Sequence, residues 1–531
     1  MKKSLWSINL MALSLIFIFS SCGGNEFDEA SLKNSRRFNM INSMENLMVV
    51  GSIDLVGIIE KSDFENSKDA PFEAVAGYKM MVKNNLDQEL TGIKLAGNNH
   101  FAVSMKADQP DYVVFTAEIT NQEKVKTTLK GLKIFKGEYS KVEEGGKTFE
   151  FLSDKNVTAA WDDKDIIVVF GEKIDTKEKA MKLLKARYVD APDNKQLAGY
   201  LKQTDDMNVY VNIETAMKVG KNSKEGKNIT KEMEDLAKGA YYIGTGNFNT
   251  GDIVFEMNVF GEKLKNSEYN VISANAVSKS FLNYLTKDNL VGFGTASIDM
   301  SAIFNAMEMA QNPEFDLSDV EAITGMNKEE MQNLLTGEFS LSFIDIINTQ
   351  VEMPKQSVDY DDFFEDDYSY NKEKPLILFA AGVSDTSKIS KLIRTSGAVP
   401  YANGVFNIEN EAYLAFSSDK MIVTTDEQTA LFFASGNTFT TYELPSGLAM
   451  EKPLFGFYNT NPSKMPKGIL KMAETEEGQM LLEFASLFKL VDFQGDFNKM
   501  TFKVEMNNKK DNALKVITDY VFGVVKDKKY I

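Results

Sequence analysis

Two side chains limit the chemistry that this chain could perform. Cys22 is the only cysteine and His100 the only histidine among 531 residues. A Cys/His zinc site or a multi-histidine metal site would each need more of these side chains than the sequence supplies, and a cysteine nucleophile would have to be Cys22. A Ser-His-Asp arrangement would have to use His100. Because His100 lies at the start of an expected strand, we interpret it as a histidine without a catalytic role, a general base being the alternative.

Cys22 stands where an apolar leader ends. Lys2 and Lys3 precede a mostly aliphatic and aromatic stretch over residues 10–19, and small residues follow it. These are the parts of a secretory signal. The sequence Phe-Ser-Ser-Cys at 19–22 resembles the lipobox of bacterial lipoproteins, which implies an acyl anchor such as palmitate on Cys22 and removal of residues 1–21. An ordinary signal peptide with an incidental cysteine is the alternative.

Residues 22–34 are expected to form a lipidated, flexible tether. The tether is acidic at Glu26, Asp28 and Glu29, which resembles the residues after the cysteine in surface-exported lipoproteins of Bacteroidota. A solvated linker would have the same composition. Gly23 is not the aspartate that resembles an inner-membrane retention signal, so we expect the outer membrane, with the periplasmic or cell-surface side left open.

Charge and hydropathy restrict the partners of the remaining chain. The formal net charge is −18, and removal of Lys2 and Lys3 with the leader makes it more negative. Nucleic acid and anionic lipid surfaces would repel such a chain. After the leader, no run approaches the roughly 20 apolar residues that a spanning helix requires. We therefore expect a globular protein held at the membrane through Cys22.

Four sequence matches recur in the same order along the chain, which predicts an internal duplication. Ser-Ile-Asp-Leu at 52–55 returns as Ser-Ile-Asp-Met at 297–300. The other matches are 115–117 with 379–381, 160–161 with 415–416, and 246–249 with 495–498. We interpret residues 35–287 and 288–531 as tandem copies of one unit, joined through an expected helix over 274–285. By this correspondence, the counterpart of His100 lies near Glu338.

The hydrophobic pattern predicts an α+β fold for each copy. Strands with period-two alternation, several of them joined by short polar turns, outnumber what a simple βαβ alternation would need, and the expected helices include 176–188, 231–238 and 476–488. We therefore expect two copies of one unit, each mainly antiparallel sheet with helices packed on one face. Asp54 and Asp299 lie at matching strand-to-helix junctions, where an N-terminal cap is favoured over catalysis.

One segment interrupts the duplication, an insertion over residues 356–374. Residues 359–370 hold six acidic and five aromatic side chains. A loop that binds a cation or a basic partner is one interpretation. The other is a solvated hairpin tip, which self-repelling acidic stretches usually form. The glycine-containing stretches 220–228 and 244–246 lack the spacing of phosphate-binding loops.

These features together resemble an uncharacterised lipoprotein family of Bacteroidota, classed as a domain of unknown function. The resemblance rests on the lipobox, the acidic tether, the repeated Ser-Ile-Asp-Leu/Met and the repeated Gly-Asn/Asp-Phe-Asn. It implies location and architecture and brings no catalytic residues. We expect an envelope lipoprotein that binds a protein, glycan or lipid without catalysis, cofactor or metal, or that acts as a scaffold. A carrier or sensor of lipid and a carboxylate-based glycan hydrolase are the alternatives.

Overall fold

The computed structural model describes residues 35–527 with internal gaps, of which the longest are 222–228, 310–324 and 353–368. The leader, Cys22 and the tether therefore lie outside the described residues, as do most of the 220–228 stretch and most of the 356–374 insertion. The chain forms two compact units. The first unit holds Met1–Asn270, Glu308–Gln311 and Phe497–Ile531, and the second holds Val271–Met307 and Asn312–Asp496.

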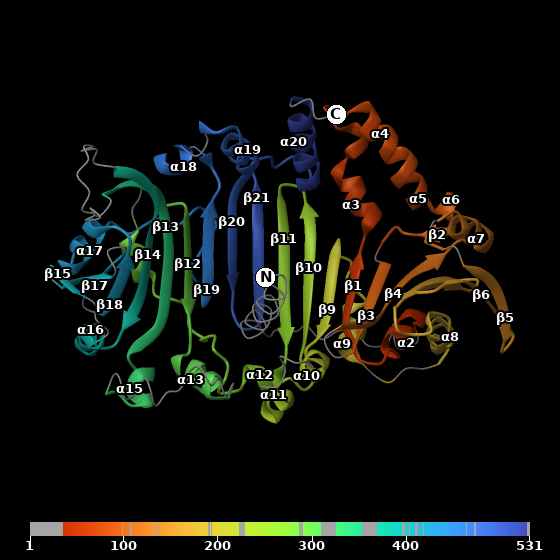
Figure 1. Ribbon diagram of the computed structural model, residues 1–531, viewed down its shortest axis with the longest axis horizontal. Helices are drawn as coiled ribbons and strands as arrows, with labels where there is room; N and C mark the ends of the chain where they lie inside the picture. The colour runs from red at the N-terminus through yellow and green to blue at the C-terminus, as the bar shows by residue number, and fades with distance from the viewer. Residues whose placement is uncertain are drawn as a thin grey trace, which may run out of the picture. The chain divides into compact units, whose positions relative to one another are not determined.

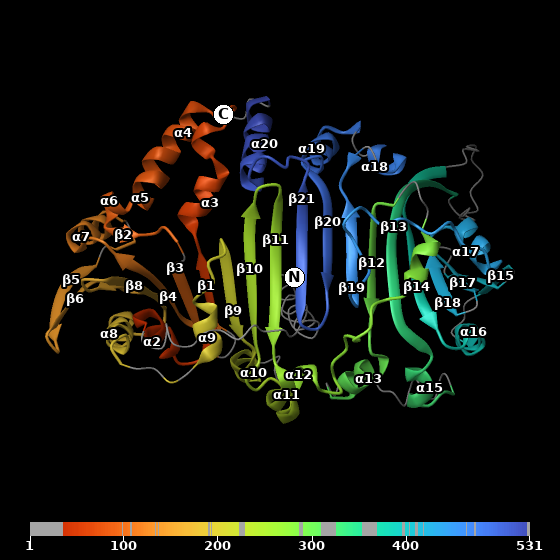
Figure 2. The ribbon, with the colours of Figure 1, turned by 180° about the vertical axis from the view of Figure 1, so that it is seen from behind.

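The first unit is built on one antiparallel sheet (Figures 1 and 2). Its strands are, in order across the sheet, β21 (Lys499–Met506), β11 (Asp252–Phe260), β10 (Tyr241–Asn249), β9 (Met207–Asn212), β1 (Leu47–Ile53), β3 (Asn99–Lys106), β4 (Gln109–Ile119), β8 (Asp165–Phe170), β7 (Val157–Trp161), β6 (Lys147–Asp154) and β5 (Glu138–Glu144). The short β2 (Ile93–Lys94) pairs with the end of β4. The predicted antiparallel sheet is therefore confirmed in this unit.

The second unit also carries an antiparallel sheet. Its strand order is β20 (Phe488–Gly495), β19 (Leu454–Asn459), β12 (Gly292–Ser297), β13 (Leu335–Glu352), β14 (Ser369–Val383), β18 (Lys420–Thr424), β17 (Ala412–Ser417), β16 (Val405–Ile408) and β15 (Val399–Ala402). When the nine strands of each unit are numbered along the chain, from β12 to β20 here and from β1 and β3 to β10 in the first unit, their order across the sheet is the same. Strands β13 and β14 lead toward the 356–374 insertion, whose residues from Ser369 onward belong to β14.

The helices lie between these strands in the chain, except that α2 precedes the first strand and α20 follows the last one. In the first unit they are α2 (Arg36–Asn42), α3 (Leu55–Ser62), α4 (Phe72–Tyr78), α5 (Asn84–Leu86), α6 (Gln88–Thr91), α7 (Gln122–Gly131), α8 (Thr176–Ala186), α9 (Lys195–Tyr200), α10 (Ile213–Lys221), α11 (Lys231–Leu236), α12 (Glu262–Lys265) and α20 (Ala513–Asp527). The second unit has α13 (Met300–Met309), α15 (Lys328–Gln332), α16 (Thr386–Thr395), α17 (Glu427–Ala434), α18 (Lys467–Lys471) and α19 (Glu476–Ala485). None of the described helices is long and apolar enough to cross a membrane.

The three helices predicted from apolar periodicity are confirmed as α8, α11 and α19. The helix expected over 274–285 is instead the short 3-10 helix η5 (Lys279–Tyr284). Both predicted caps form: the Asp54 carboxylate accepts a hydrogen bond from the Gly57 amide at 3.0 Å, and that of Asp299 accepts from the Ala302 amide at 3.1 Å. Each satisfies an amide that the first turn of its helix leaves without a partner.

The prediction that helices pack on one face is wrong for the strands β7 and β8. Ala160 and Ile167 pack with α8, whereas their neighbours Trp161 and Ile166 pack with α7. Successive side chains of a strand point to opposite faces, so α7 and α8 cover opposite sides of the sheet. The continuous apolar runs in β7 and β8 are the signature of strands buried on both faces. In the second unit the same alternation divides Ala415 and Phe416 of β17 between two core clusters.

Candidate functional site

His100, the one histidine, is enclosed within the first unit. It lies on β3 opposite Ser52 of β1, and 2% of its surface is exposed. The Arg37 guanidinium lies 3.2 Å from His100 Nδ1. Burial, with a smaller contribution from Arg37, lowers the pKa of His100 to about 3, so the ring is neutral near pH 7. A neutral ring can accept the Arg37 hydrogen bond through Nδ1, which favours a structural role.

A hydroxyl that lies opposite His100 in the sheet, that of Ser52 on β1, is engaged by a neighbouring side chain. The nearby Ser52 hydroxyl accepts a hydrogen bond from the Asn208 amide at 3.1 Å. In the second unit the matching register position, opposite Ser297, is occupied by Glu338, as the repeat predicts. The Glu338 carboxylate accepts a hydrogen bond from the Ser278 amide at 2.6 Å. The histidine therefore belongs to one unit only.

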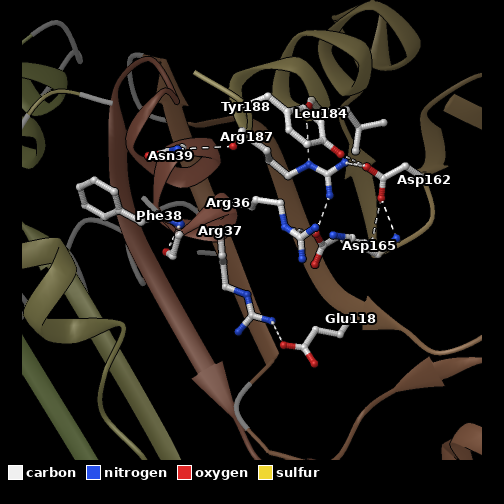
Figure 3. Close-up of polar contacts among 12 residues, drawn as sticks. Arg36, Arg37, Phe38, Asn39, Glu118, Asp162, Asp165, Leu184, Arg187 and Tyr188 are labelled. Carbon is white, nitrogen blue, oxygen red and sulfur yellow. Dashed lines mark hydrogen bonds and ion pairs between the residues drawn. The ribbon is translucent and has the colours of Figure 1, made fainter. Parts of the chain in front are cut away.

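A buried ionic network lies beside the β7–β8 turn (Figure 3). The Arg187 guanidinium, with 1% of its side chain exposed, donates to Asp162 at 2.8 Å and to Asp165 at 2.8 Å. Arg36 of α2 lies 3.3 Å from Asp165, and the Tyr188 hydroxyl donates to Asp162. These contacts join the turn to α8 and α2.

The two carboxyl groups of this network differ in pKa. Burial by itself would raise the pKa of Asp162, but Arg187, the Tyr188 hydroxyl and two backbone amides of the turn together hold it below its ordinary value. Burial raises the pKa of Asp165 above its ordinary value, and Arg187 and Arg36 offset this only in part. Since these charges are satisfied by one another, the network fits a structural role. The sequence analysis missed it, although an acidic turn between two buried strands was a visible signal.

A candidate binding surface lies on an uncharged side of the sheet in the first unit. Two rows of facing residues run across β3, β1, β9, β10, β11 and β21, and we call them the open face. The rows are Phe101, Gly51, Val209, Gly244, Met257 and Met500, then the buried Asn99, Ile53, Met207, Gly246, Phe255 and Phe502. Phe101, Met207, Phe255 and Phe502 are each 38–41% exposed. Large apolar side chains thus meet solvent in a contiguous patch.

The other side of the same strands is polar or buried. On β11 and β21 it carries ion pairs, with Lys499 2.6 Å from Glu256 and Lys503 3.3 Å from Asp252. On β1 and β3 it joins the main core through Val50 and Ala102. The polar residues of β11 and β21 therefore do not shield the open face, which lies on the opposite side of the sheet.

Aromatic rings lie directly over glycines on the open face. A Cβ atom at Gly51 would lie 1.9 Å from the ring of Phe101, and one at Gly246 would lie 2.9 Å from the ring of Phe255. Glycine is therefore required at Gly51, because a larger residue would displace the ring. The rings flatten the surface that the sheet presents.

Helices border the open face at both ends of its strands, with α3 and α20 at one end and α10 to α12 at the other (Figures 1 and 2). The second group packs onto the face itself, because Met217 and Leu264 join a cluster with Tyr242 and Met257. The helices α10 to α12 therefore rise above the open face along at least one end. We call the surface formed by the two rows of side chains the floor of the open face.

The second unit repeats this chemistry. Leu341, 55% exposed, and Tyr458, 41% exposed, lie on the corresponding side of its sheet. There the Phe493 ring lies over Gly456, where a Cβ would approach it to 2.2 Å. Two pockets lie elsewhere: one of about 390 Å³ is lined by polar side chains such as Glu330 and Lys388, and one of about 340 Å³ adjoins Pro71.

Comparison with protein-family models, with curated proteins and with solved structures found no match. Among the described residues, no group of three or more His, Cys, Asp or Glu side chains is placed to hold a metal ion. The geometry of the chain itself therefore carries the functional argument.

Proposed function

We propose that this protein is a lipid-anchored, non-catalytic binding protein of the bacterial outer membrane, and that it holds its partner on the open face of the first unit. The observation that carries the proposal is the contiguous, uncharged apolar surface there, with four large side chains 38–41% exposed. Anchoring at Cys22 and the outer-membrane location follow from the leader and the tether.

The size of the open face supports this interpretation. From β3 to β21 there are five inter-strand spacings, which correspond to about 24 Å. Each of the two rows takes two residues, or about 7 Å, of strand, so the rows together extend over roughly 14 Å and the surface covers about 340 Å². Apolar patches of this size are commonly functional, because leaving them in water is costly.

We also propose that the chain is a tandem duplication, with copies over 35–287 and 288–531. The identical neighbour order of nine strands in each unit supports it.

The proposed function is tested by asking whether the open face is covered in the envelope. Two single-cysteine variants are compared. Phe255→Cys places the thiol on the open face, and the control Val254→Cys places it on the opposite side of β11. The thioether on Cys22 leaves the introduced cysteine as the single free thiol. We expect a membrane-permeable maleimide to label both variants when purified, but only Val254→Cys in intact envelopes. Equal labelling of both positions in envelopes would refute the proposal.

A further inference from the structure

The open face of the first unit is apolar over almost its whole floor, and this restricts what it can hold. Apart from Asn99, which is 5% exposed and donates its amide hydrogens to the Leu95 and Gly97 carbonyls, its two rows contain phenylalanine, methionine, valine, isoleucine and glycine alone. We propose that the open face binds the acyl chain of a diffusible lipid. This inference rests on the proposed function, because it names the occupant of the same surface.

The floor offers a partner no hydrogen bonds. Strands β11, β10, β9 and β1 each pair with a neighbour on both sides, so their backbone groups are directed along the sheet and used there. Protein interfaces carry about one hydrogen bond per 100–200 Å², so a floor of about 340 Å² would be expected to supply two or three. An acyl chain needs none. This favours hydrocarbon over a polypeptide.

Charge favours the same occupant. The chain carries a formal net charge of −18, yet the charges of β11 and β21 lie on the opposite side of the sheet, as in the pairs Lys499–Glu256 and Lys503–Asp252. A charged partner would lose hydration at the floor without gaining an ion pair there. A methylene chain carries no charge whose hydration could be lost, and the charged or polar head of the lipid can stay in water beyond the floor.

The border of the face argues against a second copy of the chain as the occupant. Two sheets pack face to face at about 10 Å, which requires both surfaces to be clear. Here α10 to α12 are packed onto one end of the face beside Tyr242 and Met257. A narrow chain can lie on the floor beside these helices, and the unbranched methionines Met207, Met257 and Met500 can adjust to it.

The test is a titration with radiolabelled palmitate by equilibrium dialysis. The protein is the mature chain with Cys22→Ser, so that its own acyl anchor is absent. Phe255→Asp places a carboxylate on the floor, and the matched control Val254→Asp places one on the opposite side of β11. We expect saturable binding by the parent chain, a change of no more than about twofold for Val254→Asp, and a loss of at least about tenfold for Phe255→Asp.

Fluorescence of Trp161, the one tryptophan beyond the leader, checks that each variant is folded. If Phe255→Asp does not fold, Met207→Asp on β9 replaces it. Absence of saturable binding by the parent chain, or equal binding by the folded floor variant, overturns the lipid inference. Protection of a cysteine at position 255 in envelopes without palmitate binding would leave the proposed function standing and assign the face to another partner.

Discussion

Replacement of Arg187 by methionine removes the cation that both Asp162 and Asp165 contact. The Arg187 side chain is 1% exposed, and the two carboxylates are 3% and 8% exposed, so water cannot replace the lost partner. Breaking a buried pair from one side costs about 3–5 kcal/mol, because the remaining charge stays buried. Arg36, 3.3 Å from Asp165, still compensates one carboxylate. We therefore expect a loss near the lower end, about 3 kcal/mol at pH 7.

Urea unfolding followed by Trp161 fluorescence measures this loss, because Trp161 precedes Asp162 on the same hairpin and is buried. The matched control is Lys182→Met, which breaks the ion pair of Lys182 with Glu45, whose side chains are 62% and 66% exposed. Because both side chains lie in water, that pair should contribute little to stability, and the loss should be much smaller than that of the Arg187 variant. Adding Asp162→Asn to Arg187→Met should restore part of the stability. Equal losses in the Arg187 and Lys182 variants would refute the assignment of a buried network.

Three further outcomes are expected. Burial lowers the pKa of folded His100 to about 3, so the contribution of the neutral ring to the free energy of unfolding is fully present above the unfolded pKa of about 6.5 and is lost as the pH falls. This loss should amount to about 2 kcal/mol at pH 5. Urea unfolding at pH 7 and pH 5 measures it, and His100→Gln should remove this part of the difference between the two pH values. Asp54→Ala and Asp299→Ala should each cost about 1 kcal/mol in thermal or urea unfolding, more for Asp54, whose carboxylate also accepts from the Gly97 amide at 3.0 Å; no loss at either would contradict the caps. Cys22→Ser should move the protein from the membrane pellet to the soluble fraction after cell lysis, whereas retention in the pellet would contradict lipid anchoring.

Sequence patterns over a few residues were sufficient to predict the elements that short-range interactions determine. The helices α8, α11 and α19 and the caps at Asp54 and Asp299 were predicted because periodicity and capping side chains act over a few residues. The four sequence matches also placed the counterpart of His100 near Glu338, and the two residues lie opposite Ser52 and Ser297 in their sheets. The helix expected over 274–285 failed because its apolar residues, including Phe281 and Leu285, pack into the core of the second unit as a 3-10 helix and an extended segment.

The alternation along β11, with Phe255 and Met257 on one side and Val254 and Glu256 on the other, is fixed by the sequence itself, because a strand has a side-chain period of two. The same is true of the single histidine, the single cysteine and the negative charge. Which side of β11 meets solvent was decided only in the tertiary structure, where α10 to α12 cover one end of the apolar side and leave Phe255 and Phe502 exposed. Arg187 likewise reaches Asp162 and Asp165 only once α8 packs on β7 and β8. Such contacts depend on the free energy of packing segments distant in the chain, which no local pattern contains.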